Sequence, residues 1–141
     1  KPSSFLPKPP LTRLWQVDDV VDNLQTATHT LVDARSEVRF RGEQEPIDPI
    51  AGHIPGAMCL PSTENLTQDN CFKSAADLRE RFAHVASDNT VCYCGSGVTA
   101  AHNVLAMRIA GLPEAALYAD SWSGWITDRT RPIAPNPTSD T

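Results

Sequence analysis

The sequence predicts an α/β fold built around a mainly parallel sheet. Short apolar runs, typical of buried strands, alternate with segments whose apolar residues recur at helical spacing. The clearest case is the run 90–93, which leads through Cys94-Gly95-Ser96-Gly97 into a helical pattern that lasts until Gly111. In such a sheet the functional site lies beyond the carboxyl ends of the strands.

The helices are expected from apolar periodicity and from capping residues. Ser74 is a good N-cap, and Gly111 is placed to stop the helix that begins after Gly97. The pattern predicts helices near residues 17–24, 74–87, 98–110 and from 121 onward, with one helical turn at 36–40. Four apolar residues are expected to line one face of the helix after Gly97, namely Val98, Ala101, Leu105 and Ile109.

The strands are expected where compact apolar runs end in polar or turn-forming residues. The predicted strands cover residues 30–34, 57–60, 90–93 and 117–118. Between the first two, residues 42–55 contain five glycines and prolines and form a predicted irregular loop. Long loops within compact domains are often functional.

Length and composition are those of one globular domain. The 141 residues are 40% hydrophobic and 21% charged. The net charge of −5 and the lack of a Lys/Arg run argue against nucleic-acid binding. No apolar stretch is as long as a membrane span, and no signal peptide is visible. The four cysteines are too few for a disulfide scaffold, so we expect a reducing compartment and a cytoplasmic location.

Three segments are expected along the chain. Residues 1–10 hold four prolines without periodicity and are expected to form an extended linker or arm. Residues 11–131 carry the alternating pattern of the domain, and residues 132–141 are expected to be a loose tail. Because the chain begins with Lys1, we expect a processed product or an excised piece of a longer protein.

Cys94 is the main candidate for catalysis. It lies between a predicted strand and a helix entry with glycines at positions 95 and 97. Backbone N–H groups at a helix N-terminus favour negative charge, and glycines let several of them converge on one point. We therefore expect Cys94 to be a nucleophilic thiolate near neutral pH. The alternative is a structural thiol beside a turn.

Several neighbouring side chains are weaker candidates with simpler alternatives. The hydroxyls of Ser96 and Thr99 fit either substrate contacts and proton donation or turn formation. Of the arginines after the first strand, Arg39 is the preferred anion-binding residue, and Arg35 fits a structural role better. The alternative for the three arginines, Arg35, Arg39 and Arg41, is a solvated basic face.

Other chemically suggestive residues favour structural roles. His53 fits a loop anchor better than a catalytic group, and Cys92 fits a buried strand residue better than a resolving thiol. Trp122 and Trp125 are expected in the core. The Cys92–Cys94 pair has no second ligand pair at zinc-binding spacing, so no metal site is predicted.

Four segments in order resemble the rhodanese domain: Asp33-Ala34-Arg35, Gly52–Ala57, Cys94–Ala100 and Ser121–Trp125. The resemblance covers about residues 11–131 and is closest to the C-terminal, catalytic domain of two-domain thiosulfate or 3-mercaptopyruvate sulfurtransferases. It implies a central parallel sheet of about five strands with helices on both faces. It also implies that the proline-rich start follows an inactive rhodanese domain in the full-length chain.

The resemblance implies ping-pong sulfur transfer without a cofactor. The thiolate of Cys94 would take the outer sulfur of an anionic donor as a persulfide and pass it to cyanide, a thiol or thioredoxin. Ser96 would assist catalysis, and Arg39 would bind the donor. The persulfide would be held by the loop and the start of the helix, at Gly95, Gly97, Val98, Thr99 and Ala100.

The same resemblance leaves the donor open between thiosulfate and 3-mercaptopyruvate. The loop at Cys94 is similar to the mercaptopyruvate type, in which a serine at the place of Ser96 joins a His and an Asp of the N-terminal domain. Asp48, however, stands where that type has a second arginine. Asp120 and Gly124 stand where the family usually has glycine and glutamate.

Two other functions are considered on the same architecture. Cell-cycle phosphatases share the rhodanese fold but need an arginine that closes a Cys-x₅-Arg loop, and Ala100 occupies that position here. A non-catalytic module that carries a persulfide or binds a partner is the second alternative, because a missing upstream domain would leave the crevice open on one side.

Overall fold

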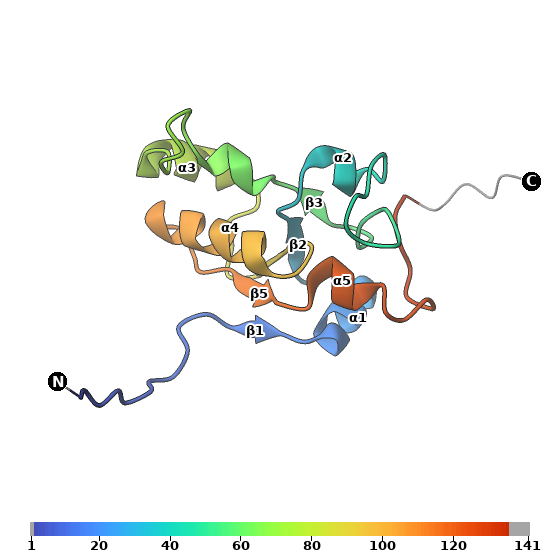
Figure 1. The fold of residues 1–141 in the computed structure, drawn as a ribbon, viewed down its shortest axis with the longest axis horizontal. Helices are drawn as coiled ribbons and strands as arrows, with labels where there is room; N and C mark the ends of the chain where they lie inside the picture. Colours follow the sequence, from blue (N-terminus) through green and yellow to red (C-terminus); the bar gives the residue numbers. More distant parts are fainter. Residues whose placement is uncertain (1, 136–141) are drawn as a thin grey trace, which may run out of the picture.

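One parallel sheet organises the computed structural model, which describes residues 2–135. Within that range five strands pair in the order β1-β5-β4-β2-β3, and every pair is parallel (Figure 1). Their bounds are β1 Leu14–Trp15, β2 Thr30–Asp33, β3 Met58–Cys59, β4 Thr90–Tyr93 and β5 Ala116–Tyr118. The predicted α/β class with a parallel sheet of five strands is confirmed.

Helices cover both faces of this sheet, as predicted. They are α1 Val17–Thr26, α2 Glu37–Phe40, the 3₁₀ helix η1 Ser62–Asn65, α3 Ala75–Phe82, α4 Val98–Ile109 and α5 Ser121–Trp125. Alternate residues of a strand point to opposite faces. Tyr93 therefore packs with α1 and α5, whereas Cys92 packs with α3 and α4, giving two core clusters on either side of the sheet (Figure 1).

The predicted apolar face of α4 is not the buried one. Val98, Leu105 and Ile109 are 74%, 48% and 39% exposed. The helix instead buries the face that carries Val104 and Met107. Apolar residues surround most of α4, so periodicity did not distinguish its faces; small alanines at positions 100 and 106 let the buried face pack closely on the sheet.

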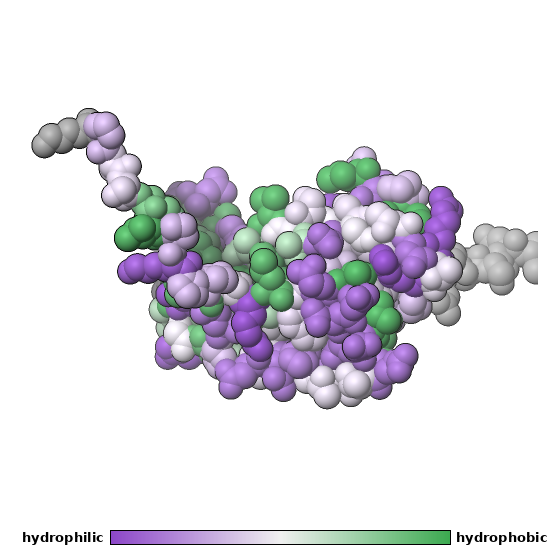
Figure 2. Space-filling view, turned by 90° about the horizontal axis from the view of Figure 1, so that it is seen from below, coloured by the Kyte–Doolittle hydropathy of each residue, from purple (hydrophilic) through white to green (hydrophobic). Residues whose placement is uncertain are grey.

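The N-terminal arm projects from the domain. Residues 2–10 carry no helix or strand and extend away from β1 (Figure 1). Phe5 and Leu6 are 86% and 81% exposed. Figure 2 shows hydrophobic surface on this arm, whereas the body of the same face mixes hydrophobic and hydrophilic side chains.

The predicted loose tail differs from the structure where the structure describes it. Ala134 pairs with His53 through two backbone hydrogen bonds, and Ile133 packs against the core cluster that contains the α5 tryptophans. A Cβ on Gly52 would lie 2.7 Å from the Ala134 carbonyl oxygen, so glycine makes room for this strand-like contact. Residues 136–141 of the predicted tail lie outside the described residues.

No helix within residues 2–135 combines the length and apolar character needed to cross a bilayer.

Candidate active site

Cys94 lies at the carboxyl edge of the sheet, directly after its central strand β4. In the β2–β4 register Asp33 is opposite Tyr93, so the segments that follow both strands emerge side by side. The sequence predicted this shared edge from the positions of Asp33-Ala34-Arg35 and Cys94. The structure therefore brings Arg39, one of the candidate arginines, and the candidate thiol to one crevice.

A cavity of about 200 Å³ lies at this edge and reaches Cys94. Cys94 is only 2% exposed, and it forms part of the cavity wall. The cavity also contains Ile47, Asp48 and Ser123. Most of the predicted site residues line the same space, namely Arg39, Gly95, Ser96, Val98 and Thr99. Ala100 does not line it, because its side chain is buried in the core cluster between the sheet and α4.

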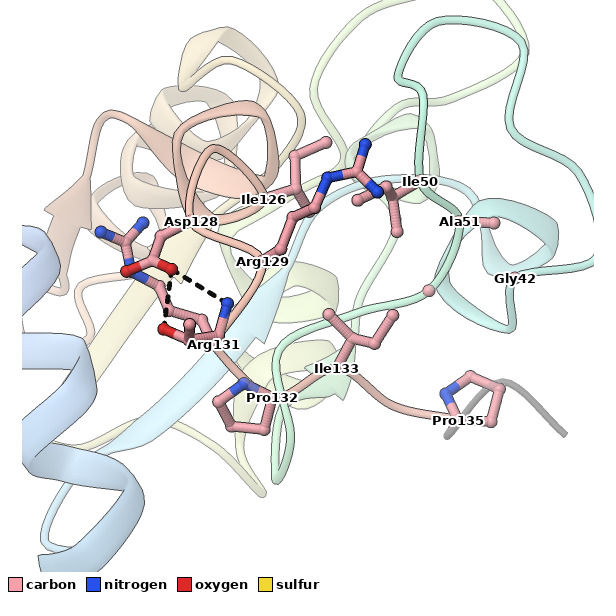
Figure 3. A pocket seen from close by; sticks show the side chains of 12 residues that line it. Gly42, Ile50, Ala51, Ile126, Asp128, Arg129, Arg131, Pro132, Ile133 and Pro135 are labelled. Atoms are coloured by element: carbon pink, nitrogen blue, oxygen red, sulfur yellow. Dashed lines mark hydrogen bonds and ion pairs between the residues drawn. The ribbon is translucent and has the colours of Figure 1, made fainter. Parts of the chain in front are cut away.

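A larger cavity, of about 850 Å³, lies elsewhere and does not contain Cys94. It is formed between the loop that includes Ile50 and the segment after α5, where Ile126 and Ile133 line it and Arg129 extends toward Ile50 (Figure 3). We assign the candidate active site to the smaller cavity because only a cavity that reaches the nucleophile can admit a reacting group.

The backbone amide of Gly97 donates a hydrogen bond to Sγ of Cys94 over 3.1 Å. Gly97 has a φ of +85°, and a Cβ there would lie 2.6 Å from the Ala119 carbonyl oxygen. Glycine is therefore required both by the left-handed backbone and by the close approach of residue 119. The sequence predicts a cradle of several amides around the sulfur. Within residues 2–135, one backbone amide, that of Gly97, donates a hydrogen bond to it.

The start of α5 holds the cysteine loop in place. The Cys94 amide donates to Oγ of Ser121 over 3.0 Å, and the Trp122 amide donates to the Cys94 carbonyl oxygen over 3.0 Å. The Ser123 amide donates to the Gly95 carbonyl oxygen over 2.9 Å. The sequence correctly placed Trp122 in the core. It gave no sign of this bracing, because two of the three bonds join backbone groups and the third joins residues 27 positions apart.

Arg35 is structural, as the sequence favoured. Its guanidinium pairs with Asp33, the shortest contact being 2.7 Å, and donates to the Gly52 carbonyl oxygen over 2.7 Å. It also lies 5.0 Å from the ring centre of Trp122. Burial lowers the pKa of Arg35, but the hydrogen bond and charge of Asp33 outweigh that effect and leave the pKa raised. Arg35 thus joins β2, the loop after it and α5.

Arg39 lines the cavity and pairs with two carboxylates. Its Nε and Nη2 donate to Glu45 over 3.1 and 2.8 Å, and Nη2 also lies 3.2 Å from Oδ2 of Asp48. Oδ1 of Asp48 accepts a hydrogen bond from Ser123 over 2.7 Å. The Arg39 guanidinium lies against Gly95, since a Cβ there would be 3.6 Å from both terminal nitrogens. The predicted anion-binding arginine is therefore in place but already paired.

Glu45 is a site residue that the sequence did not single out. Burial raises the pKa of Glu45, but the Arg39 hydrogen bond and the amides of Ile47 and Asp48 outweigh it and leave the pKa lowered. Glu45 also lies 3.4 Å from Arg35, so its carboxylate joins the structural arginine to Arg39. No spacing rule could have found it, because it lies in the irregular loop.

His53, Cys92 and Arg41 have structural contacts and do not line the cavity at Cys94. His53 stacks on Phe40 with ring centres 3.7 Å apart, and its Nδ1 lies 2.7 Å from the Phe40 carbonyl oxygen, so it anchors the loop. Burial, followed by the charge of Cys94, raises the pKa of Cys92 to about 12, which makes it unsuited to act as a resolving thiol. Arg41 pairs with Glu37 and Glu43 at the surface.

Comparison with known proteins agrees with this geometry. The family description "Rhodanese-like domain" matches residues 16–128. The chain belongs to the rhodanese family. It also resembles the yeast Tum1 protein, whose crystal structure gives a TM-score of 0.71 at 26% identity over 82% of this chain and 43% of that one. The rhodanese fold and the motifs that predicted it are thereby confirmed.

Sequence relatives of this rhodanese chain carry sulfurtransferase names. It is 46% identical to a probable 3-mercaptopyruvate sulfurtransferase of Pseudomonas aeruginosa, over 95% of this chain and 49% of that protein. It is 40% identical to the human 3-mercaptopyruvate sulfurtransferase, over 82% of this chain and 40% of that protein. A putative thiosulfate sulfurtransferase, SseB, of Mycobacterium tuberculosis is 44% identical over 74% and 37%, respectively. The chain thus spans half or less of each of these relatives.

Residues 2–135 bring no group of three or more His, Cys, Asp or Glu side chains together in a way that would hold a metal ion.

Proposed function

We propose that this rhodanese domain is a sulfurtransferase in which Cys94 carries the transferred sulfur as a persulfide. One observation carries the proposal: the sulfur of Cys94 accepts the Gly97 amide at the wall of a cavity open to small molecules. An amide N–H stabilises an anionic sulfur by donating a hydrogen bond to it, so the reaction does not need a general base beside the sulfur. The names of the relatives at 40–46% identity support the same reaction.

The reaction has two half-steps. The Cys94 thiolate attacks the outer sulfur of the donor, and a new S–S bond forms. The old bond to that sulfur breaks with its electron pair, which releases sulfite from thiosulfate or the enolate of pyruvate from 3-mercaptopyruvate. An acceptor thiolate or cyanide then attacks the outer sulfur and releases the Cys94 thiolate. No oxidant or cofactor enters either step.

The cavity suggests a role for each neighbour. Arg39 would orient the anionic donor, and Ser96 at the mouth of the loop would bond to donor or acceptor. The start of α4 would surround the bound sulfur through Gly95, Gly97, Val98 and Thr99. Ala100, buried in the core, is left with its backbone alone for such a contact.

Donor and partners are part of the same proposal. Thiosulfate and 3-mercaptopyruvate are both small anions, and the acceptor is cyanide, a low-molecular-weight thiol or thioredoxin. A preceding rhodanese domain would complete the crevice in a full-length chain, as the length of the relatives suggests. The four free cysteines suit a reducing compartment, which we propose to be the cytoplasm.

The carrier module is the second candidate. The paired state of Arg39 favours it, because a guanidinium already held by Glu45 and Asp48 has less to offer an anionic donor. A carrier would accept sulfur from a protein and show little turnover with small donors. A phosphatase is disfavoured, since Ala100 replaces the arginine that would bind a phosphoryl group.

Steady-state assays separate these functions. The protein is incubated with thiosulfate or 3-mercaptopyruvate plus cyanide, and thiocyanate is measured. Sulfurtransferase activity predicts turnover with at least one donor, its loss in Cys94→Ser and its retention in Cys71→Ser, a matched change at an exposed thiol. Turnover that survives Cys94→Ser removes Cys94 from the mechanism. Absence of turnover with both donors favours the carrier.

A further inference from the structure

Gly124 lies in α5 at a point where there is no room for a side chain. A Cβ built there would lie 2.5 Å from Cβ of Asp120 and 3.5 Å from its Cγ. Bonded geometry fixes a Cβ to its backbone, so no rotation of the Asp120 side chain can relieve a contact this short. Residue 124 is therefore a glycine because Asp120 packs directly on it.

Asp120 and Gly124 lie at the two ends of the segment that contacts the cysteine loop. Between Asp120 and Gly124 are the residues that contact the loop: Ser121 accepts the Cys94 amide, and the next two backbone amides donate to Cys94 and Gly95. The Gly124 amide in turn donates to the Asp120 carbonyl oxygen over 2.8 Å, which closes the turn. A displacement of residue 120 relative to residue 124 must move the loop contacts between them.

The same segment also sets the position of the sulfur's donor. The carbonyl oxygen of Ala119, next to Asp120, lies 2.6 Å from the place of a Cβ on Gly97. The amide of Gly97 is the group that donates to Sγ of Cys94. Residues 119–124 therefore contact the loop on two sides, at the carbonyl groups of Cys94 and Gly95 and at Gly97.

We propose that Asp120 and Gly124 are a matched pair of positioning residues, whose close packing holds α5 in the place that aims the Gly97 amide at Cys94. Neither touches the reacting sulfur, so both act through the loop. A side chain at residue 124 is compatible with this arrangement only when residue 120 has no Cβ. The inference rests on the proposed role of Cys94, which it extends to a second layer of residues.

Three variants test the pair: Gly124→Ala, Asp120→Gly with Gly124→Ala, and Asp120→Ala with Gly124→Ala. The last is the matched control, because it removes the carboxylate but keeps the Cβ that causes the contact. Two readouts are measured on each folded variant, namely kcat and KM for thiocyanate formation and the rate of Cys94 alkylation by iodoacetamide. Cys71, which is exposed, serves as the internal reference thiol in the same peptide maps.

Gly124→Ala is expected to lower kcat and Cys94 alkylation about tenfold while KM and Cys71 alkylation stay within about twofold, as displacement of a positioned group predicts. The Asp120→Gly double variant recovers both readouts, and the Asp120→Ala double variant does not. If Gly124→Ala fails to fold, the Asp120→Ala double variant, which keeps the same contact, is expected to fail with it, and recovery of folding, kcat and Cys94 alkylation in the Asp120→Gly double variant then carries the test. Wild-type behaviour of Gly124→Ala, or like behaviour of the two double variants, overturns the proposal.

Alkylation needs no sulfur donor. A wild-type protein that forms no thiocyanate therefore contradicts the proposed function but leaves the test of this pair readable.

Discussion

The amide of Gly97 lies 3.1 Å from the sulfur of Cys94, in a turn whose φ of +85° and contact with Ala119 admit only glycine. One residue thus supplies both the shape of the loop and the donor to the nucleophile. The chemistry proposed for this domain depends on that relationship, because an anionic sulfur needs a fixed donor more than it needs a base.

Gly97→Ala tests the relationship from the side of the donor. The added Cβ meets the Ala119 carbonyl oxygen at 2.6 Å and a left-handed backbone, so the loop must change. We expect the free energy of unfolding to fall by about 1–3 kcal/mol and thiocyanate formation to fall at least about tenfold. Urea unfolding and the cyanide assay measure the two effects, and an active, equally stable variant would show that the loop geometry is not needed.

Asp48→Asn tests the charge of the cavity. A carboxylate about 4 Å from a bound anion repels it by about 1 kcal/mol even in water. Removal of the Asp48 charge should therefore raise kcat/KM for thiosulfate by at least about fivefold. The amide retains an oxygen to accept the Ser123 hydroxyl. Glu43→Gln makes the same charge change at an exposed ion pair and should leave kcat/KM unaltered. Equal effects of the two substitutions would assign the change to net charge alone.

Asp48→Arg examines donor choice at the same position. A second guanidinium in the cavity can pair with a carboxylate, which 3-mercaptopyruvate has and thiosulfate lacks. We expect the ratio of kcat/KM for 3-mercaptopyruvate to that for thiosulfate to rise. Unchanged kinetics with both donors would mean that Asp48 does not control specificity.

Cys92→Ala separates the two neighbouring thiols. Cys92 is fully buried in the cluster shared with α3 and α4, and burial raises its pKa to about 12. We expect its removal to cost about 1 kcal/mol of stability through a small cavity and to leave sulfur transfer within about twofold of wild type. Loss of transfer in a folded Cys92→Ala protein would instead give this thiol a part in the reaction.

Two half-buried histidines make stability depend on pH. Burial lowers the pKa of His53 and of His102 from 6.5, although the hydrogen bond to Phe40 partly opposes it at His53. The folded protein therefore binds fewer protons than the unfolded chain just below pH 6.5, so the free energy of unfolding should decrease as the pH falls through that value.

Urea unfolding on either side of that pH measures the effect. The decrease should be smaller in His53→Gln, because the glutamine at position 53 does not titrate. Stability that rises on acidification over the same range would contradict the lowered pKa of these half-buried imidazoles.

The local features of this fold are predictable from the sequence. Strand β4, the glycine loop and the N-cap Ser74, whose side chain accepts the Asp77 amide, are all fixed by residues close in the chain. The face of α4 is different, because Val98 and Val104 are both apolar and only the sheet decides which is buried. The prediction failed where local pattern offered two equivalent answers.

Contacts between distant segments account for what the sequence did not reveal. Ser121 lies 27 positions from Cys94, and Ser123 lies 75 positions from Asp48. In the sequence, Asp120 and Gly124 are two separate departures from the residues that the resemblance leads one to expect. In the structure they are one feature, since the side chain at 120 fills the space that a side chain at 124 would need.

The central claim is that Cys94 carries the sulfur, and mass spectrometry of the protein itself tests it most directly. After incubation with the donor that supports turnover and removal of excess reagent, the intact protein should gain the mass of one sulfur atom. Peptide mapping should place that atom on Cys94, and cyanide should remove it as an equal amount of thiocyanate. A sulfur atom found on Cys59, Cys71 or Cys92, or an equal gain in Cys94→Ser, would contradict the account.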